Sequence, residues 1–272
     1  MPRTSPHPDP DTSSTRRVPA VARAVALLDA LAASRQPRSL ADLARELKLP
    51  RSSAHGLLAT LVDLGLARRN GEAEFSLGAK ALHWADAWTA QSDVRRAFDA
   101  WVDHLPELRT ETVMLAALEG SEVTYLACRQ GSRSLAVNFR VGGRFPASCT
   151  ASGKAMLATH DDAAVRSHLG RDRLPTLTRF GVSRVPALLK QLATVREAGF
   201  AIDDEETAEG MQCFGAPVFE ARGGPASAAV AVSVIKAGLT PARRAALAQS
   251  ITRLAAQLSQ ELGAPLRLRP AA

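Results

Sequence analysis

Cysteine is scarce in this chain, with Cys128, Cys149 and Cys213 the three occurrences among 272 residues. They stand far apart and show no C-x-x-C spacing, so the sequence provides neither a disulfide framework nor a zinc ribbon. The histidines show no metal-ligand spacing either. We therefore expect no metal and no cofactor, and a reducing cytoplasm suits such a protein.

Long apolar runs are also missing. No stretch of about 18 consecutive apolar residues exists, and the N-terminus lacks the apolar segment of a signal peptide. Residues 1–17 are rich in Pro, Ser, Thr and Asp and have almost nothing to bury, which predicts a disordered tail. Residues 265–272 are expected to form a second tail. The sequence thus predicts a soluble cytoplasmic protein with no membrane partner.

The composition favours two packed domains and an anionic partner. The chain is 46% hydrophobic, which is ample for two cores at this length. Its formal net charge is +7, from 34 basic and 27 acidic residues, without a polybasic arm. The first seventy residues hold 11 Lys and Arg against 6 Asp and Glu. This modest asymmetry places part of the positive charge in the N-terminal region.

The segment 39–66 predicts a helix-turn-helix. Ser39 suits an N-cap, and the apolar residues that follow it recur at helical spacing. Leu49-Pro50 interrupts this pattern, because proline disfavours helix at the residue before it and is tolerated in a first helical turn. A second helix is predicted from Arg51. A helix from about Val21 to Ser34 would complete a three-helix core.

The second helix has a small, polar face that is cationic at its start. We predict that this face enters the major groove of DNA, with its first residues near base edges and phosphates. Gly65 then suits a helix C-cap, Asn70-Gly71 predicts a two-residue hairpin turn, and the flanking strands would form a wing. Two helices alone fit a generic scaffold equally well, and the wing favours DNA binding. The predicted DNA-binding residues are Ser39, Arg51, Ser52, Ser53, His55, Arg68 and Arg69.

Residues 79–100 predict one continuous helix, whose part 79–97 would link two domains. A further amphipathic helix is predicted over residues 93–109. Trp84 and Trp88 need a partner surface, and a second subunit is the simplest one. The alternative is that both tryptophans pack on their own domain.

Residues 98–264 predict an α+β domain with an antiparallel sheet flanked by helices. Strand patterns cover residues 112–116, 122–127, 135–141, 200–202, 211–219 and 226–235. Helix patterns cover residues 150–158, 184–198 and 240–262. The loop before residue 150 would feed a helix N-terminus, where free N–H groups attract an anion such as a carboxylate. A nucleotide-binding P-loop is excluded, because Ser148 stands where that motif requires glycine.

Several ordered motifs resemble the IclR family of bacterial transcriptional regulators. They are ARAVALLDALA, the segment 39–66, FSLGAKAL, TASGKAMLA, GFAIDDEETAEGMQCFGAPVF and AAVAVSV. The resemblance implies an N-terminal winged helix-turn-helix over 18–78, a linker helix over 79–97 and a GAF-like effector domain over 98–264. It also implies a homodimer or a dimer of dimers on a palindromic operator of a double-stranded DNA. Effectors in this family are commonly small carboxylates or aromatic acids from catabolic pathways.

The resemblance further implies an effector site. Gly153, Asp203, Cys213 and Ser233 match positions that contact effector, and Ala151 and Met211 are weaker candidates for the walls. Ala231 stands where many relatives carry serine, which favours a larger or aromatic acid over a very small, highly polar one. On the DNA side, Gly56 stands where relatives commonly carry arginine. Taken without the resemblance, residues 203–206 are more simply a solvated acidic loop.

The function predicted from the sequence is that of a DNA-binding regulator, a repressor of a catabolic operon rather than an enzyme. Two alternatives come from other classes. Cys213 or Cys149 could serve a cysteine-dependent enzyme, although no ordered Cys, His and Asp constellation surrounds either one. A buried lone cysteine is more often a small hydrophobe. The other alternative is a protein-interaction module that uses the winged helix without DNA.

Overall fold

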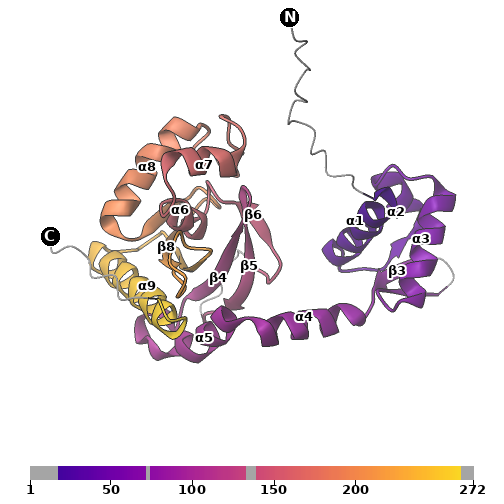
Figure 1. The fold of residues 1–272 in the computed structure, drawn as a ribbon, viewed down its shortest axis with the longest axis horizontal. Helices are drawn as coiled ribbons and strands as arrows, with labels where there is room; N and C mark the ends of the chain where they lie inside the picture. Colours follow the sequence, from indigo (N-terminus) through magenta and orange to yellow (C-terminus); the bar gives the residue numbers. More distant parts are fainter. Residues whose placement is uncertain (1–17, 72–73, 133–138, 265–272) are drawn as a thin grey trace, which may run out of the picture. The chain divides into compact units, whose positions relative to one another are not determined.

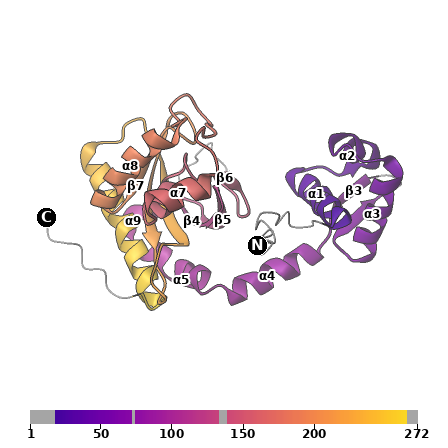
Figure 2. The same cartoon turned by 45° about the horizontal axis from the view of Figure 1, so that its top comes forward.

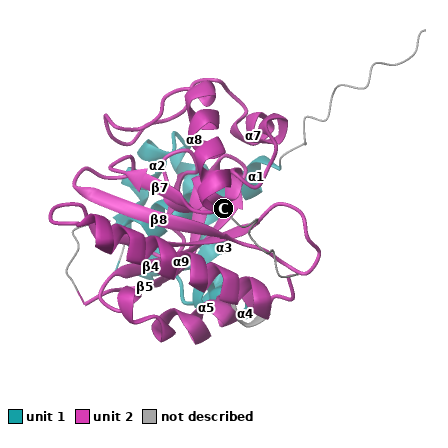
Figure 3. Ribbon diagram, turned by 90° about the vertical axis from the view of Figure 1, so that its left-hand side faces the viewer, with its two compact units in different colours: residues 1–88 teal, residues 89–272 magenta. Residues whose placement is uncertain are grey.

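A computed structural model describes residues 18–71, 74–132 and 139–264 of the chain (Figure 1). The contacts divide the chain into two units, Met1–Trp88 and Thr89–Ala272, each with its own core. The two units are coloured separately in Figure 3. Among the described residues, no helix has both the length and the apolar character needed to cross a bilayer.

The N-terminal unit contains the three predicted helices (Figure 2). These are α1 (Pro19–Ala33), α2 (Leu40–Glu46) and α3 (Arg51–Asp63). Leu27, Leu43 and Leu58 are fully buried, one from each helix, and they share one hydrophobic core. The predicted cap is present, because the side chain of Ser39 accepts a hydrogen bond from the N–H of Asp42 at 3.1 Å. Helix-turn-helix order is therefore confirmed.

A small antiparallel sheet completes this unit. It consists of β1 (Arg38–Ser39), β2 (Ala67–Asn70) and β3 (Glu74–Leu77), in the order β1-β3-β2. Gly65 has the predicted positive φ, at 74°. The two-residue turn was wrong, because Asn70 pairs with Glu74 and three residues therefore connect the strands. Gly71 at φ 61° occupies the first of these three positions, which its lack of a Cβ permits.

The continuous helix predicted over residues 79–100 was wrong, because it is broken at Ser92. Helix α4 (Lys80–Gln91) ends there, Ser92 has the extended angles φ −97° and ψ 98°, and α5 (Asp93–Trp101) begins anew. Serine is a weak helix former and Asp93 in the first turn of α5 suits the positive end of a helix, although the Ser92 side chain makes no cap hydrogen bond. The helix predicted to reach residue 109 is also shorter, since two 3₁₀ turns cover 102–104 and 106–108.

The C-terminal unit is built on a six-stranded antiparallel sheet in the order β6-β5-β4-β9-β8-β7. The strands are β4 (Thr112–Glu119), β5 (Glu122–Arg129), β6 (Arg144–Pro146), β7 (Ala201–Asp204), β8 (Met211–Val218) and β9 (Ala228–Ile235). The predicted antiparallel sheet is therefore confirmed. Strand β6 was not anticipated. The strand predicted over 135–141 lies mostly outside the described residues, and residues 139–141 are not in a strand.

Helices cover both faces of this sheet. Helices α6 (Ala151–Leu157), α7 (Asp162–Leu169) and α8 (Val185–Ala198) share one core with it, and α5 and α9 (Pro241–Glu261) share the other. Figure 3 shows α7 and α8 on one side of the sheet and α5 and α9 on the opposite side. Helix α7 was not predicted, although the sequence carries a typical capping residue at each of its ends. Asp161 accepts a hydrogen bond from the N–H of Ala164 at 2.7 Å, and Gly170 ends the helix at φ 64°.

Candidate DNA-binding and effector-binding sites

Helix α3 presents its predicted polar face to solvent. Arg51, Ser52 and His55 are exposed and Ser53 is half-buried, while Ala54 on the opposite face is fully buried. The N-cap residue is Pro50, which has no side-chain acceptor for the first N–H groups of the helix. The positive end of α3 is therefore available to a phosphate oxygen, next to the guanidinium of Arg51.

Ser39 lies at the start of α2 and its hydroxyl is engaged within the domain. It accepts from the N–H of Asp42 and donates to Asp42 Oδ2 at 2.8 Å. Ser39 therefore stabilises the N-terminus of α2 as its cap. A contact with DNA from this residue stays a prediction.

The two wing arginines face opposite sides of the small sheet. Residues paired directly across two strands share a face, and Arg69 pairs with Phe75 whereas Arg68 pairs with Ser76. Arg68 Nε donates to Asn70 Oδ1 at 3.0 Å, on the face opposite Phe75. Arg68 and Arg69 therefore point to opposite sides of the sheet although they are adjacent in the sequence.

In the C-terminal unit, three of the predicted effector residues form one row across the sheet. Asp203 of β7 pairs with Cys213 of β8, which pairs with Ser233 of β9. The Cys213 Sγ and Ser233 Oγ atoms lie 3.2 Å apart. All three side chains are at least nine-tenths buried, with Ser233 fully inaccessible. Residues distant in the sequence thus meet in one polar row inside an apolar core.

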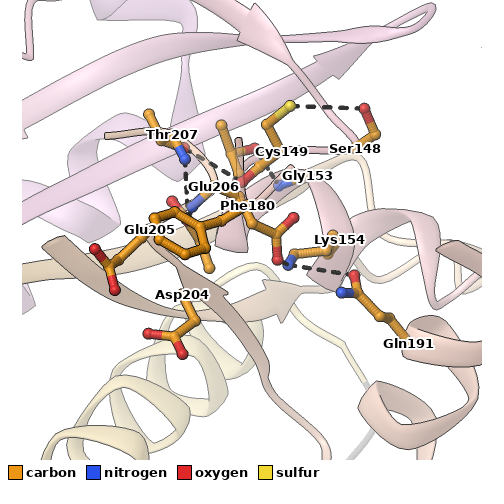
Figure 4. Close-up of polar contacts among 12 residues, drawn as sticks. Ser148, Cys149, Gly153, Lys154, Phe180, Gln191, Asp204, Glu205, Glu206 and Thr207 are labelled. Carbon is orange, nitrogen blue, oxygen red and sulfur yellow. Dashed lines mark hydrogen bonds and ion pairs between the residues drawn. The ribbon is translucent and has the colours of Figure 1, made fainter. Parts of the chain in front are cut away.

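The acidic segment 203–206, which includes the end of β7, is not simply a solvated loop, because Asp203 and Glu206 are buried. Asp203 Oδ1 accepts hydrogen bonds from the N–H groups of Glu206, at 2.7 Å, and Thr207, at 3.1 Å. Thr207 Oγ1 in turn donates to the carbonyl of Cys149 at 3.2 Å, which joins this turn to the segment before α6 (Figure 4). The segment therefore builds part of the interior.

Burial sets the ionisation of this row. It raises the pKa of the Asp203 carboxyl, against the opposing effect of Lys154 and the two N–H groups. It also raises the pKa of the Cys213 thiol well above its usual range, with the neighbouring Asp203 charge adding to the shift. A protonated thiol is a poor nucleophile. The geometry offers hydrogen-bonding groups here and gives no support to a cysteine-dependent reaction.

Replacing Asp203 by asparagine should flatten the pH dependence of stability. The folded protein binds the Asp203 proton more tightly than the unfolded chain does, so this contribution is complete below the unfolded pKa and is lost as the pH rises through the folded pKa. Asparagine can still accept both N–H bonds and does not titrate. Denaturant unfolding of both proteins between pH 4 and 7 measures the difference. An unchanged slope in Asp203→Asn would show that another group titrates.

Gly153 has a packing role that the sequence had not indicated. A Cβ at this position would lie 2.5 Å from the Cα of Ala147, so glycine permits a close approach of α6 to the chain before it. Ala151 is similarly held, since a Cβ on Gly215 of β8 would lie 2.6 Å from its carbonyl carbon. Helix α6 is thereby pressed against the sheet beside Met211 and Cys213. Contact of Ala151, Gly153 and Met211 with effector stays a prediction.

A buried ion pair lies beside the row and was missed from the sequence. Lys154 of α6 pairs with Glu206, and their side chains are 1% and 5% exposed. Lys154 Nζ also lies 3.5 Å from Gln191 Oε1 of α8 (Figure 4). The Glu206 Oε2 atom has no hydrogen-bond partner among the described residues. The sequence feature that could have indicated this pair is Lys154 itself, a charged residue among the mostly small and apolar residues 151–158.

Comparison with known proteins identifies the chain. The family model for the IclR helix-turn-helix domain matches residues 20–71, and that for the bacterial transcriptional regulator IclR C-terminal domain matches residues 87–260. The chain belongs to the IclR family. Family membership confirms a helix-turn-helix DNA-binding domain followed by an IclR effector domain, in a transcriptional regulator rather than an enzyme.

Relatives of known role agree with this assignment. The chain is 34% identical to the regulator TtgV of Pseudomonas putida, with 71% of this chain and 74% of TtgV covered. It is 28% identical to XynR of Escherichia coli, with 91% and 98% covered. The crystal structure of the repressor BlcR of Agobacterium tumefaciens matches with a TM-score of 0.60 at 35% identity, covering 91% of this chain and 98% of BlcR. An IclR homologue of Microbacterium hydrocarbonoxydans, complexed with 4-hydroxybenzoate, shares the fold at 22% identity and a TM-score of 0.75, with 89% and 98% covered.

Proposed function

We propose that this IclR-family protein is a sequence-specific repressor of a catabolic operon that responds to a small carboxylate or aromatic acid. The observation that carries the DNA half is the exposed, uncapped N-terminus of α3 with Arg51 beside it. Residues 18–78 would bind the operator and residues 98–264 would bind the effector. Residues 79–97 would form the linker between these two domains. Such a protein acts in the cytoplasm, on the DNA of the bacterial nucleoid.

The proposed DNA contacts divide by chemistry. Arg51 and His55 would reach base edges or phosphates from α3, and Ser52 and Ser53 would bind phosphate with hydroxyl or backbone N–H groups. Arg68 and Arg69 would contact the flanking backbone or minor groove from the two sides of the wing, and Ser39 would add a backbone contact at α2. No contact from Gly56 is proposed, so the operator of a relative does not transfer to this chain.

The proposed effector site is the row formed by Asp203, Cys213 and Ser233, walled by α6. A carboxylate needs hydrogen-bond donors, and the thiol and hydroxyl of the row supply them. Burial raises the pKa of the Asp203 carboxyl, which lessens its repulsion of a bound anion. The absence of a hydroxyl at Ala231 and the 4-hydroxybenzoate bound by a family member both favour an aromatic acid.

Fluorescence anisotropy tests this proposal. The purified protein is titrated against its own upstream intergenic DNA and a shuffled control at two salt concentrations, with and without candidate acids. Tight, salt-sensitive binding with strong preference for the native sequence supports a regulator, and an acid that shifts it by a coupling of about 1–3 kcal/mol supports an effector. Binding equal to the charge-driven control on all upstream fragments, with every acid, would instead favour the protein-interaction module.

Arg51→Ala should weaken operator binding by about 1–3 kcal/mol if Arg51 reads a base. If it holds a phosphate, the loss should be similar on all sequences and the salt slope should fall by about one. The same anisotropy titrations separate the two results. Unchanged affinity together with an unchanged slope would remove Arg51 from the interface.

A second copy of the chain is the proposed partner of α4. Its Leu82, Trp84 and Trp88 side chains are 74%, 51% and 45% exposed. Trp84 and Trp88 stand four residues apart and so share one face of the helix. A dimer that buries this face would place two α3 helices on a palindromic operator, and a dimer of dimers would extend it.

The double variant Trp84→Ala/Trp88→Ala should shift the protein towards monomer. Burying two tryptophans contributes several kcal/mol to association, of which truncation removes most. Sedimentation velocity over a range of protein concentrations measures the change. His83→Ala, an exposed substitution on the same helix, is the matched control. Identical association in the double variant and the control would exclude α4 from the interface.

A further inference from the structure

Strand β7 is an edge of the six-stranded sheet, and its outer side carries free backbone groups. The N–H of Glu205 donates to the carbonyl of Met211 at 3.0 Å, which sets the phase of the ladder with β8. Hydrogen-bonded positions alternate along an antiparallel strand, so Ala201 and Asp203 also bond towards β8. The N–H and C=O groups of Ile202 and Asp204 therefore point away from the sheet. No described residue supplies a hydrogen bond to these backbone groups.

A pocket of about 360 Å³ lies at this edge, between β7 and α8. Its apolar walls come from Val195 and Ala198 of α8 and from Phe200 and Ile202. Lys154, Gln191, Thr194, Asp204 and Glu206 add polar groups. The volume lies in the range of small-molecule sites, which combine apolar walls with a few placed polar groups. We refer to it as the edge pocket.

The edge pocket is distinct from the proposed effector row. None of the three row residues lines the pocket: Asp203 is buried in the core, whereas Ile202 and Asp204, which alternate with it along β7, line the pocket. Lys154 of α6, which lies beside the row, also lines the pocket together with α8, so the two sites are neighbours with different lining residues.

The charges that line the edge pocket are compensated within the protein. Lys154 pairs with Glu206. Asp204 pairs with Lys236 at 2.9 Å and accepts from Gln212 Nε2 at 2.8 Å. A charged ligand would have to break one of these pairs or enter without a counter-ion, which costs free energy in a partly desolvated site. The pocket therefore favours a neutral ligand.

We propose that the edge pocket binds a neutral carboxamide carrying an apolar group. An amide presents an N–H beside a C=O, which complements the outward C=O and N–H of Ile202. Its apolar group would lie against Phe200, Val195 and Ala198. The isosteric carboxylate lacks the N–H donors and brings an uncompensated charge. The edge pocket would thus select against the acids that the effector row favours.

The chain offers a direct probe, because Ile202, Ile235 and Ile251 are its only isoleucines. Labelling the full-length protein with [¹⁵N]isoleucine gives three backbone amide signals, and Ile202→Val assigns the one from the edge. Indole-3-acetamide is titrated against the protein, and indole-3-acetate serves as the matched acid. We expect the amide to shift the Ile202 signal with an affinity of about millimolar, and the signal of the buried Ile251 to stay in place. The acid should leave the Ile202 signal unmoved.

Two substitutions on α8 localise the binding. Thr194→Trp fills the edge pocket and should abolish the shift, whereas Ala193→Trp, an equally exposed neighbour outside the pocket, should preserve it. Both variants retain Ile202 and therefore its amide signal. A folding defect would move all three isoleucine signals before any ligand is added, which distinguishes it from a loss of binding. The proposal is overturned if indole-3-acetamide leaves Ile202 unmoved, if indole-3-acetate moves it equally, or if Thr194→Trp responds as Ala193→Trp does.

Discussion

Lys154→Met is expected to lower the free energy of unfolding of the C-terminal unit by about 3–5 kcal/mol, the usual cost of removing one partner from a buried ion pair. Glu206 would keep its buried position, with one oxygen that already has no hydrogen-bond partner among the described residues and another that loses its cation. Methionine retains most of the lysine volume, so the loss reflects charge and not a cavity. Denaturant unfolding followed by circular dichroism measures it.

The double variant Lys154→Met/Glu206→Leu identifies the cause. If the uncompensated carboxylate destabilises the single variant, then removing it should restore most of the stability, because an apolar pair of similar volume is often neutral or stabilising. If the double variant is as unstable as the single one, Lys154 acts through packing along α6 instead. A loss below about 1 kcal/mol in Lys154→Met would contradict the buried pair itself.

Local sequence features predicted the helix-turn-helix well. Ser39 as a cap, Pro50 at a helix start and Gly65 with positive φ each act within a few residues, so their consequences can be worked out without the rest of the fold. The failure at Ser92 had the same local character. The apolar spacing of 79–100 continues through Ser92 and Asp93, which favour a new helix start, so the spacing alone does not reveal the break.

The effector domain was predictable in outline and not in its contacts. Strand patterns indicated the sheet, and the pairing of Asp203, Cys213 and Ser233 then depends on strand order and register, which periodicity does not determine. Lys154 and Glu206 are 52 residues apart, so no local pattern connects them. The family resemblance therefore predicted the residues of the row, whereas the Lys154–Glu206 ion pair could be recognised only from the three-dimensional structure.

Gly153→Ala is expected to destabilise the C-terminal unit by about 3 kcal/mol, at the upper end of the range for overpacking. The new Cβ would lie 2.5 Å from the Cα of Ala147, and a backbone atom cannot move aside as a flexible side chain does. Helix α6 or the segment before it would have to shift, together with the wall of the effector row. Denaturant unfolding in the absence of any effector measures this loss.

Gly56→Ala in α3 is the matched control, because a Cβ there meets nothing within 4 Å. Alanine in an exposed helix interior should raise stability by about 0.5–1 kcal/mol. The same chemical change thus has opposite expected signs at the two glycines. If Gly153→Ala unfolds as the wild type does but binds effector more weakly, then glycine serves ligand approach at this position, as first predicted. If it loses stability without effector, packing against Ala147 is why glycine is needed there.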